Sequence, residues 1–293
     1  MHGHFLDGRL VAAYWQEKIR LAIAENTRKR SPHLAVITVG AHPASAVYVR
    51  KKKEACRTIG ITSSHIALEH STSENDLLYA IHSLNQAEEV DGILLQLPLP
   101  CHLYAPKFTQ TIDPKKDVDG LHPINMGKLL LGEKDGLIPC TPLGISMLLD
   151  YYSINTRGQN VVVLGRSNLV GKPIAALLMQ PGQGGDATVT VVHSQSQDLA
   201  SHCQRADILI VAVGSPHLIQ AHMVQEGTIV IDVGINPQKP PTFTGKTQIL
   251  GDVDFLHVAP KCSWITPVPG GVGPMTIAML LRNTWLAYEK RVL

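Results

Sequence analysis

The chain has 293 residues, 44% of them hydrophobic, which is enough for two domains of ordinary size. Its 26 basic and 24 acidic residues leave a net charge of +2, so charge indicates neither a nucleic-acid nor a membrane partner. The five cysteines form no CxxC pair, and the fourteen histidines show no recognised ligand spacing, which predicts a cytoplasmic protein with reduced thiols and no metal site.

The first third of the chain alternates between apolar strands and amphipathic helices. This alternation predicts a parallel α/β sheet with right-handed crossovers. Strands are expected at 34–39, 65–68 and 92–97, and helices at 9–26, 46–59 and after a capping box that begins at Ser73.

Prolines, glycines and charged residues increase between 100 and 142, which is typical of loops. We place a domain boundary there, giving a first domain over 1–140 and a second over 141–273. A helix over 141–152 would connect the two domains. A closing helix over 274–293 is expected to complete the first domain.

The second domain opens with a strand, a loop and a helix. The apolar run 161–164 stops at Gly165, and Lys172-Pro173 follows Gly171 at the expected start of a helix. Backbone N–H groups at such a helix start can bind a pyrophosphate. The middle glycine of the standard dinucleotide motif is missing, so an ordinary strand-to-helix turn is the alternative.

The strand expected at 187–192 ends in His193-Ser194, without the carboxylate that usually binds the ribose of NAD. Arg166 and Ser194 are instead suited to the 2′-phosphate of NADP. The alternative is that Arg166 is solvated and Ser194 caps a helix. The loop 181–185 is expected close to the adenosine end of the cofactor.

Two further buried strands, at 207–213 and 228–233, end at Gly214 and Gly234. Glycines at the carboxyl ends of parallel strands let a ligand approach the backbone. The loop 266–274 is rich in both proline and glycine, which favours a functional loop over a linker.

The first domain contains a candidate acid/base group. Tyr48 and Lys52 share a face of the helix expected at 46–59, and Gln96 is a polar residue at the end of an apolar strand. If the first and third strands are parallel neighbours, Gln96 lies at the same edge as the start of that helix. A lysine at this edge would be partly desolvated, with a lowered pKa, and Asp119 could supply a carboxylate. The alternatives are a solvated Lys52 and a turn-forming Asp119.

Six motifs follow one another along the chain. They are Val39–Ser45 with Tyr48 and Lys52, Gln96–Pro100, Lys116–Gly120, Pro139–Pro142, Gly165–Gly171 and Pro267–Thr276. Together they resemble the methylenetetrahydrofolate dehydrogenase/cyclohydrolase family, and the resemblance extends from Asp7 to the C-terminal helix.

This resemblance implies an aminoacid-dehydrogenase-like first domain, a Rossmann-type second domain and two reactions of folate one-carbon metabolism. The first reaction is NADP-dependent oxidation of 5,10-methylenetetrahydrofolate, and the second is hydrolysis of the methenyl product to 10-formyltetrahydrofolate. It also implies a homodimer formed through the cofactor domain.

The resemblance further assigns roles to individual residues. Lys52 would transfer protons, Gln96 would tune it, Tyr48 would stack on the folate and Asp119 would anchor the pterin. Further folate contacts would be Leu97, Pro98, Pro269, Gly270 and Gly273. The dinucleotide would be held by Thr141, Gly165, Arg166, Ser167, Ser194, Ile235 and Thr276.

Two other functions are compatible with the same architecture. A shikimate-dehydrogenase-like enzyme also pairs a small α/β domain with an NADP domain, although it does not need the set formed by Tyr48, Lys52 and Gln96. A non-catalytic NADP-binding protein is the second alternative, because fold alone does not exclude it.

Overall fold

The computed structural model describes residues 4–26, 30–40, 43–238 and 248–292, with the side chains of 43–48 and 292 outside the described set. The chain divides into two compact units. One consists of 13–140 and 277–293, and the other of 1–12 and 141–276. In the described ranges, no helix combines the length and the apolar character needed to cross a membrane.

The unit of 13–140 and 277–293 is built on a parallel sheet with the strand order β3-β2-β4. Strand β2 is therefore central, and it pairs with β4 from Leu34↔Gly92 to Ile37↔Leu95. This pairing confirms the expected adjacency of the first and third strands. The three strands are β2 (His33–Val39), β3 (Thr62–Leu68) and β4 (Gly92–Leu95).

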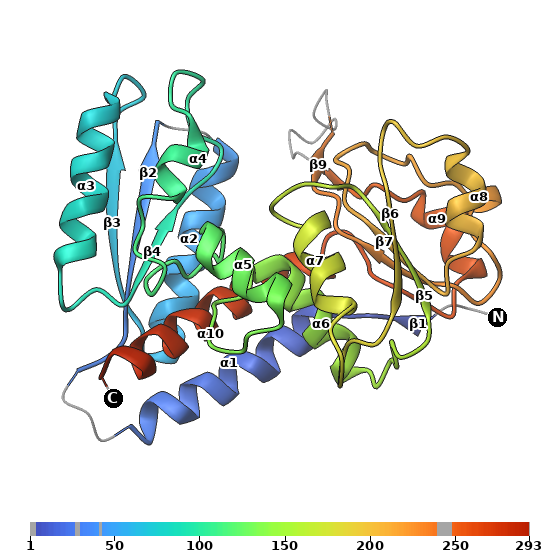
Figure 1. Cartoon of the computed structure of the whole chain (residues 1–293), viewed down its shortest axis with the longest axis horizontal. Helices are drawn as coiled ribbons and strands as arrows, with labels where there is room; N and C mark the ends of the chain where they lie inside the picture. The colour runs from blue at the N-terminus through green and yellow to red at the C-terminus, as the bar shows by residue number, and fades with distance from the viewer. Residues whose placement is uncertain (1–3, 27–29, 41–42, 239–247, 293) are drawn as a thin grey trace. The chain divides into compact units, whose positions relative to one another are not determined.

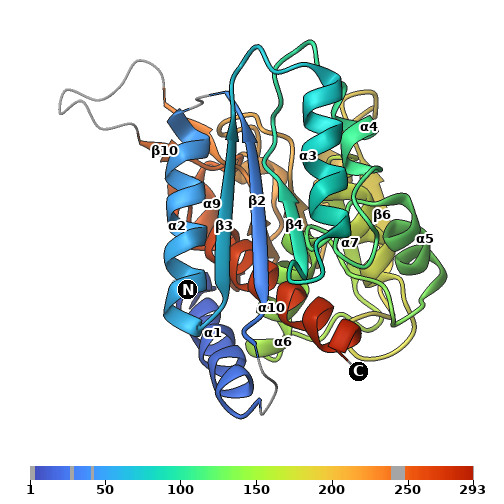
Figure 2. The ribbon, with the colours of Figure 1, turned by 90° about the vertical axis from the view of Figure 1, so that its left-hand side faces the viewer.

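Helices cover both faces of this sheet, as the two crossovers require (Figures 1 and 2). Ala35 and Ile37 of β2 belong to a core with Leu77 and Ile81 of α3 (Glu74–Gln86). The alternate residues of β2 face the helix α2 (Pro43–Ile59), where Leu34 lies near Cys56. The helix that carries Lys52 thus packs on the opposite face from α3.

The segment 100–140 contains two helices that we did not predict, α4 (Ala105–Thr109) and α5 (Pro123–Leu131). Both begin with a proline in the first turn, and the ring of His122 accepts a hydrogen bond from Ile124 N at the start of α5. Pro106 and Pro123, which suggested a loop, lie instead in the first turns of these helices. An isolated parallel bridge between Ile93 and Asp117 attaches this segment to β4.

Helices α1 (Gly8–Ala24) and α10 (Val272–Val292) lie side by side in both views (Figures 1 and 2). Within the unit, the Arg282 guanidinium lies 5.9 Å from the centre of the Trp15 ring. Arg30 and Arg291 both pair with the fully buried Asp91, with shortest distances of 2.6 and 3.2 Å. Asp91 therefore ties the end of α10 to the start of β4.

The unit of 1–12 and 141–276 contains a parallel six-stranded sheet with the order β1-β11-β8-β7-β5-β6. The hydrophobic core of this unit includes buried strand residues such as Leu164, Leu209 and Val230. The strands are β1 (His4–Phe5), β5 (Asn160–Leu164), β6 (Thr188–Val192), β7 (Ile208–Val211), β8 (Ile229–Asp232) and β11 (Trp264–Ile265).

Short helices and a small hairpin complete this unit. They are α6 (Cys140–Tyr151), α7 (Gly171–Leu178), α8 (Leu199–Gln204), the 3₁₀ turns η1 (Ala221–Met223) and η2 (Ala259–Lys261), α9 (Phe255–Val258) and the antiparallel pair β9 (Asn236–Pro237) and β10 (Ile249–Leu250).

The first twelve residues lie in this unit, which differs from our placement of them in the first domain. The reason is the pairing of β1 with β11, where Phe5 aligns with Ile265. A two-residue strand has no periodicity, so its partner cannot be read from sequence pattern.

Candidate active site

The ammonium of Lys52 and the side chain of Gln96 meet at the carboxyl edge of the three-stranded sheet. Lys52 Nζ donates to Gln96 Oε1 at 2.9 Å, and Gln96 Nε2 donates to the carbonyl of Leu97 at 2.8 Å. The second bond holds the amide so that its oxygen faces the lysine. Gln96 directly follows β4, and its N–H donates to Ile37 O at 2.9 Å, which extends the alignment of β4 with β2.

The surroundings of Lys52 disfavour its charged form. Burial lowers the pKa of the Lys52 ammonium, while the negative charge of Asp119 opposes that shift. Burial likewise raises the pKa of Asp119, and the charge of Lys52 opposes that change. The structure thus brings Lys52, Gln96 and Asp119 into one electrostatic neighbourhood, which supports the predicted desolvated lysine.

The loop that carries Asp119 is held tightly on both sides. Before it, Asp117 accepts hydrogen bonds from His122 N at 2.8 Å and Asn125 Nδ2 at 2.9 Å. After it, Gly120 has a φ of +73°, and a Cβ there would lie 2.6 Å from the carbonyl carbon of Ile138. Only glycine fits this contact.

Cys140 is a site residue whose role the sequence did not reveal. Its thiol is buried and donates to Val118 O at 3.2 Å. Burial, together with the charge of Asp119, raises the pKa of this thiol well above its usual range. Cys140 is therefore a neutral hydrogen-bond donor, because the reactive thiolate form is disfavoured.

The remaining predicted folate contacts of this unit are only partly described. The side chain of Tyr48 lies outside the described residues, although its backbone belongs to α2. Leu97 and Pro98 follow Gln96 and are joined by a cis peptide bond. Leu97 is half-buried, whereas Pro98 is exposed.

In the other unit, Gly165 and Gly171 shape the turn between β5 and α7. Gly165 has a φ of +119°, and a Cβ there would lie 2.3 Å from Ala212 O. A Cβ on Gly171 would lie 2.0 Å from Gly165 O. Ser167 Oγ accepts a hydrogen bond from Val170 N at 3.1 Å. The two glycines are thus required by close packing within the turn, which lies at the edge where dinucleotides bind in such sheets.

Arg166 and Ser194 occupy equivalent positions past two paired strands. Leu164 of β5 aligns with Val192 of β6, and each of the two residues lies two positions beyond that pair. Both are exposed. The edge therefore offers a cation and a hydroxyl, and no carboxylate follows directly on β6.

The other predicted ligand contacts of this unit lie at helix starts and in two loops. Thr141 Oγ1 and Thr276 Oγ1, in the first turns of α6 and α10, are 3.0 Å apart. Gly270 has a φ of +118°, in the turn that also contains the exposed Pro269. A Cβ on Gly273 would meet nothing within 4 Å, so the backbone there is open. Ile235, after β8, is 47% exposed.

Two buried aspartates, Asp232 and Asp252, support this edge and were not predicted. Asp252 Oδ2 accepts from the N–H groups of Val213 and Gly214 at 2.8 and 2.9 Å. Asp232 Oδ1 accepts from Gly234 N and Asp252 N, both at 2.9 Å. Burial raises the pKa of Asp232 to about 6. The sequence signal for Asp232 was a carboxylate at the end of an apolar strand, and the signal for Asp252 was a carboxylate directly after Gly251.

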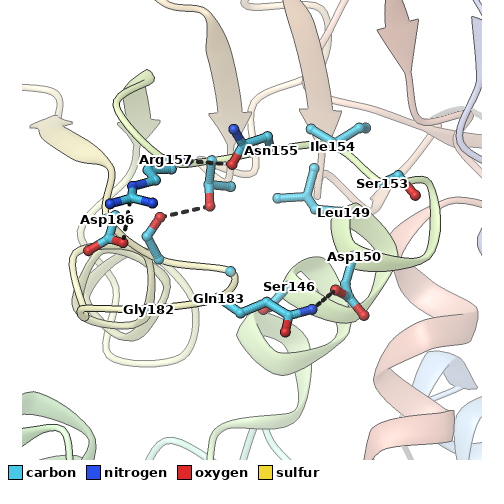
Figure 3. Close-up of a pocket in the computed structure, with 13 residues that line it drawn as sticks. Ser146, Leu149, Asp150, Ser153, Ile154, Asn155, Arg157, Gly182, Gln183 and Asp186 are labelled. Carbon is cyan, nitrogen blue, oxygen red and sulfur yellow. Dashed lines mark hydrogen bonds and ion pairs between the residues drawn. The ribbon is translucent and has the colours of Figure 1, made fainter.

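A cavity of about 550 Å³ lies elsewhere in this unit (Figure 3). Its wall includes Gln183, which bonds to Asp150 at 3.0 Å, and the ion pair of Arg157 with Asp186. The loop 181–185 precedes β6, so it lies at the amino edge of the sheet. The turn after β5 lies at the opposite edge, and the placement of the loop 181–185 beside the adenosine end of the cofactor stays a prediction.

Comparison with known proteins identifies the family. Residues 6–119 match the tetrahydrofolate dehydrogenase/cyclohydrolase catalytic domain, and residues 139–292 match the NAD(P)-binding domain of the same family. The bifunctional protein FolD of Protochlamydia amoebophila is 52% identical over 288 residues, which cover 97% of each chain. This chain belongs to the tetrahydrofolate dehydrogenase/cyclohydrolase family.

Solved structures of the family agree with the fold described above. The bifunctional FolD enzyme of Campylobacter jejuni is 45% identical, with a TM-score of 0.92 over 98% of this chain and 99% of that chain. The FolD enzyme of Trypanosoma brucei, solved with NADP and an inhibitor, is 35% identical, with a TM-score of 0.94 over 100% and 99% of the two chains.

Membership of the tetrahydrofolate dehydrogenase/cyclohydrolase family confirms the predicted function. The enzyme is a methylenetetrahydrofolate dehydrogenase and a methenyltetrahydrofolate cyclohydrolase of folate one-carbon metabolism. The shikimate-dehydrogenase-like and non-catalytic alternatives are thereby set aside. Within 4–26, 30–40, 43–238 and 248–292, no group of three or more His, Cys, Asp or Glu residues is arranged to hold a metal ion.

The contact between Lys52 and Gln96 predicts how the lysine responds to charge. Replacing Gln96 by Glu places a carboxylate beside Nζ, which favours the ammonium form. The pKa of Lys52 should therefore rise, and the pH at which its ε-carbon NMR signal titrates should move upward. Gln110→Glu, at an exposed glutamine of the same unit, is the control. An unchanged Lys52 titration in Gln96→Glu would contradict the contact.

Proposed function

We propose that Lys52 is the proton-transfer residue of the cyclohydrolase reaction, with Gln96 tuning it. The observation that carries this proposal is the 2.9 Å contact of Nζ with Gln96 Oε1 in a half-buried site. Burial lowers the pKa of Lys52, which favours its neutral amine and lets it accept a proton and return it. Asp119 and Tyr48 would bind the folate beside it.

The hydrolysis needs two proton movements in opposite directions. A water molecule attacks the methenyl carbon and loses a proton, which the neutral Lys52 amine accepts. The Lys52 ammonium then returns this proton to the ring nitrogen as its bond to the carbon breaks, while the new hydroxyl group becomes the formyl carbonyl and releases its own proton to solvent. Gln96 Oε1 keeps Nζ directed at one place in both steps, because its own amide is held by Leu97 O.

The dehydrogenase reaction depends on positioning. We propose NADP as the cofactor, since the close-packed turn at Gly165 and Gly171 leaves backbone free to approach a pyrophosphate. When bound, the cofactor accepts the hydride from the substrate methylene group. Thr141, Ser167, Ile235 and Thr276 are proposed to hold it. Pro98, with Pro269, Gly270 and Gly273, would contact the folate.

The proposed domains follow from this division of labour. Residues 1–140 together with the closing helix 274–293 would supply the folate-binding function and 141–273 the NADP-binding function, with 1–12 packed in the unit of 141–276. A cytoplasmic location is proposed as well, because all five cysteines are free thiols, four of them buried.

Replacing Lys52 by Met should separate the two activities. The variant should lose at least about a hundredfold of its cyclohydrolase rate, since it lacks the acid/base group. Hydride transfer needs no such group, and Lys52 is not among the residues proposed to hold the cofactor. NADP⁺ binding should therefore persist. Decay of the methenyl chromophore measures hydrolysis, and fluorescence of NADPH measures cofactor binding.

Lys53→Met is the matched control, because Lys53 is an exposed neighbour on the same helix. Its hydrolysis rate should equal that of the wild type. Undiminished hydrolysis by Lys52→Met at any pH would refute the assignment.

Replacing Arg166 by Ala should weaken NADP⁺ more than NAD⁺. A charge-assisted bond to the 2′-phosphate contributes about 1.5–3 kcal/mol, so KM for NADP⁺ should rise roughly tenfold to a hundredfold. Steady-state dehydrogenase assays with each cofactor measure the ratio. Arg157→Ala, which removes a cation at the opposite edge of the sheet, should leave the ratio unchanged. An equal loss with both cofactors would argue against 2′-phosphate recognition by Arg166.

We further propose that the enzyme is a homodimer in which two β6 strands pair. In the described part of the chain β6 hydrogen-bonds to β5 alone, and Val191 is 39% exposed. Thr188 N and Val192 O bond toward β5, so the backbone of Val189 and Val191 points outward. Antiparallel pairing of two such edges uses the same surface of both subunits, as a dimer with twofold symmetry requires.

This interface predicts an effect of proline at position 191. Val191→Pro removes one outward N–H without disturbing the bonds to β5, so it should shift the dimer toward monomer. Sedimentation velocity measures the mass. Val191→Thr keeps the N–H and should remain dimeric. A monomeric wild type, or a dimeric Val191→Pro, would exclude this interface.

A further inference from the structure

Asn283 is a fully buried amide on α10 that contacts the loop carrying Asp119. Its Nδ2 donates to Val118 O and to Ile138 O, both at 2.9 Å. The same nitrogen lies 3.7 Å from Cys140 Sγ. One side chain therefore joins the residue directly before Asp119 to the segment that packs against Gly120.

Asn283 joins two segments of the chain, one that ends directly before Asp119 and one that packs against Gly120 directly after it. Val118 O accepts from both Asn283 and the Cys140 thiol. Gly120 approaches Ile138 so closely that no side chain fits between them. The backbone on each side of Asp119 is thus anchored to the same short segment, and the direction of the carboxylate depends on these anchors.

The other half of the Asn283 amide has an unmet hydrogen bond. Asn283 Oδ1 is buried and has no partner in the described structure. An unpaired buried acceptor costs about 1–3 kcal/mol, which an apolar residue of the same size would avoid. Such an apolar residue could not, however, hold Val118 O and Ile138 O together as the Asn283 nitrogen does.

We propose that Asn283 is a positioning residue that fixes the Asp119 carboxylate in its place beside Lys52. This inference rests on the proposed roles of Asp119 and Lys52. The charged or titratable groups that act on Lys52 are Asp119, Cys140 and, on its own helix, Cys56. Both thiols are raised in pKa and stay neutral, so Asp119 supplies the only negative charge among them.

A displaced Asp119 would have two measurable effects. The folate would lose its anchor, which should raise its KM about tenfold, the effect of one lost charge-assisted bond. Lys52 would lose the charge that favours its ammonium form, so the cyclohydrolase pH profile should move to lower pH. A purely structural residue would lower the amount of folded enzyme without moving that profile.

The test is a double-mutant cycle of Asn283→Leu and Asp119→Ala. Asn283→Leu should raise the folate KM and shift the pH profile in the otherwise unchanged enzyme. In the Asp119→Ala background it should do neither, because the group that it positions is absent. Thr284→Val is the control, since Thr284 is equally buried on the same helix but bonds only to Leu280 O.

Three outcomes decide the proposal. A shift that disappears in the Asp119→Ala background supports it. An unchanged KM and profile, or the same change in both backgrounds, overturns it. If Asn283→Leu does not fold, Asn283→Ser takes its place, and the same comparison applies. Wild-type enzyme without hydrolysis, or Lys52→Met with full hydrolysis, would refute the proposed function itself.

Discussion

The parallel pairing of β2 with β4 is the constraint on which the acid/base site depends. It brings the end of β4 to the edge beside α2, so that Gln96 and Lys52 meet at 2.9 Å. Without that meeting, the half-buried ammonium would lose a hydrogen-bond acceptor that offsets its desolvation. A neutral acceptor serves better than a second carboxylate, because it satisfies a hydrogen bond without locking the lysine in its charged form.

In the NAD(P)-binding unit, glycines and two buried aspartates shape the corresponding sheet edge. Glycines at the β5 turn permit backbone approach, and Asp232 and Asp252 hold the neighbouring loops by accepting backbone N–H groups. In the described ranges no ion pair involves either aspartate, so their cost of burial is offset by hydrogen bonds alone. The backbone at this edge is therefore held by hydrogen bonds to two buried carboxylates.

Sequence reasoning predicted those features that depend on strand order and on local pattern. The adjacency of Lys52 and Gln96 followed from parallel strands, and the Gly165 turn followed from the end of an apolar run. It missed α4 and α5, because prolines at helix starts resemble loop prolines. It also missed Asn283 and Asp252, because their partners are distant in sequence.

The pairing of β1 with β11 and the packing of α10 also bear on how the enzyme forms during synthesis. Strand β1 is made early, yet its partner begins at Trp264. The Asp119 loop is likewise complete long before Asn283 emerges. Strand β1 and the Asp119 loop cannot make these contacts until the residues from 264 onward have been synthesised. Both units therefore stay incompletely folded while the chain is still being made. Contacts of such long sequence separation close late and slowly.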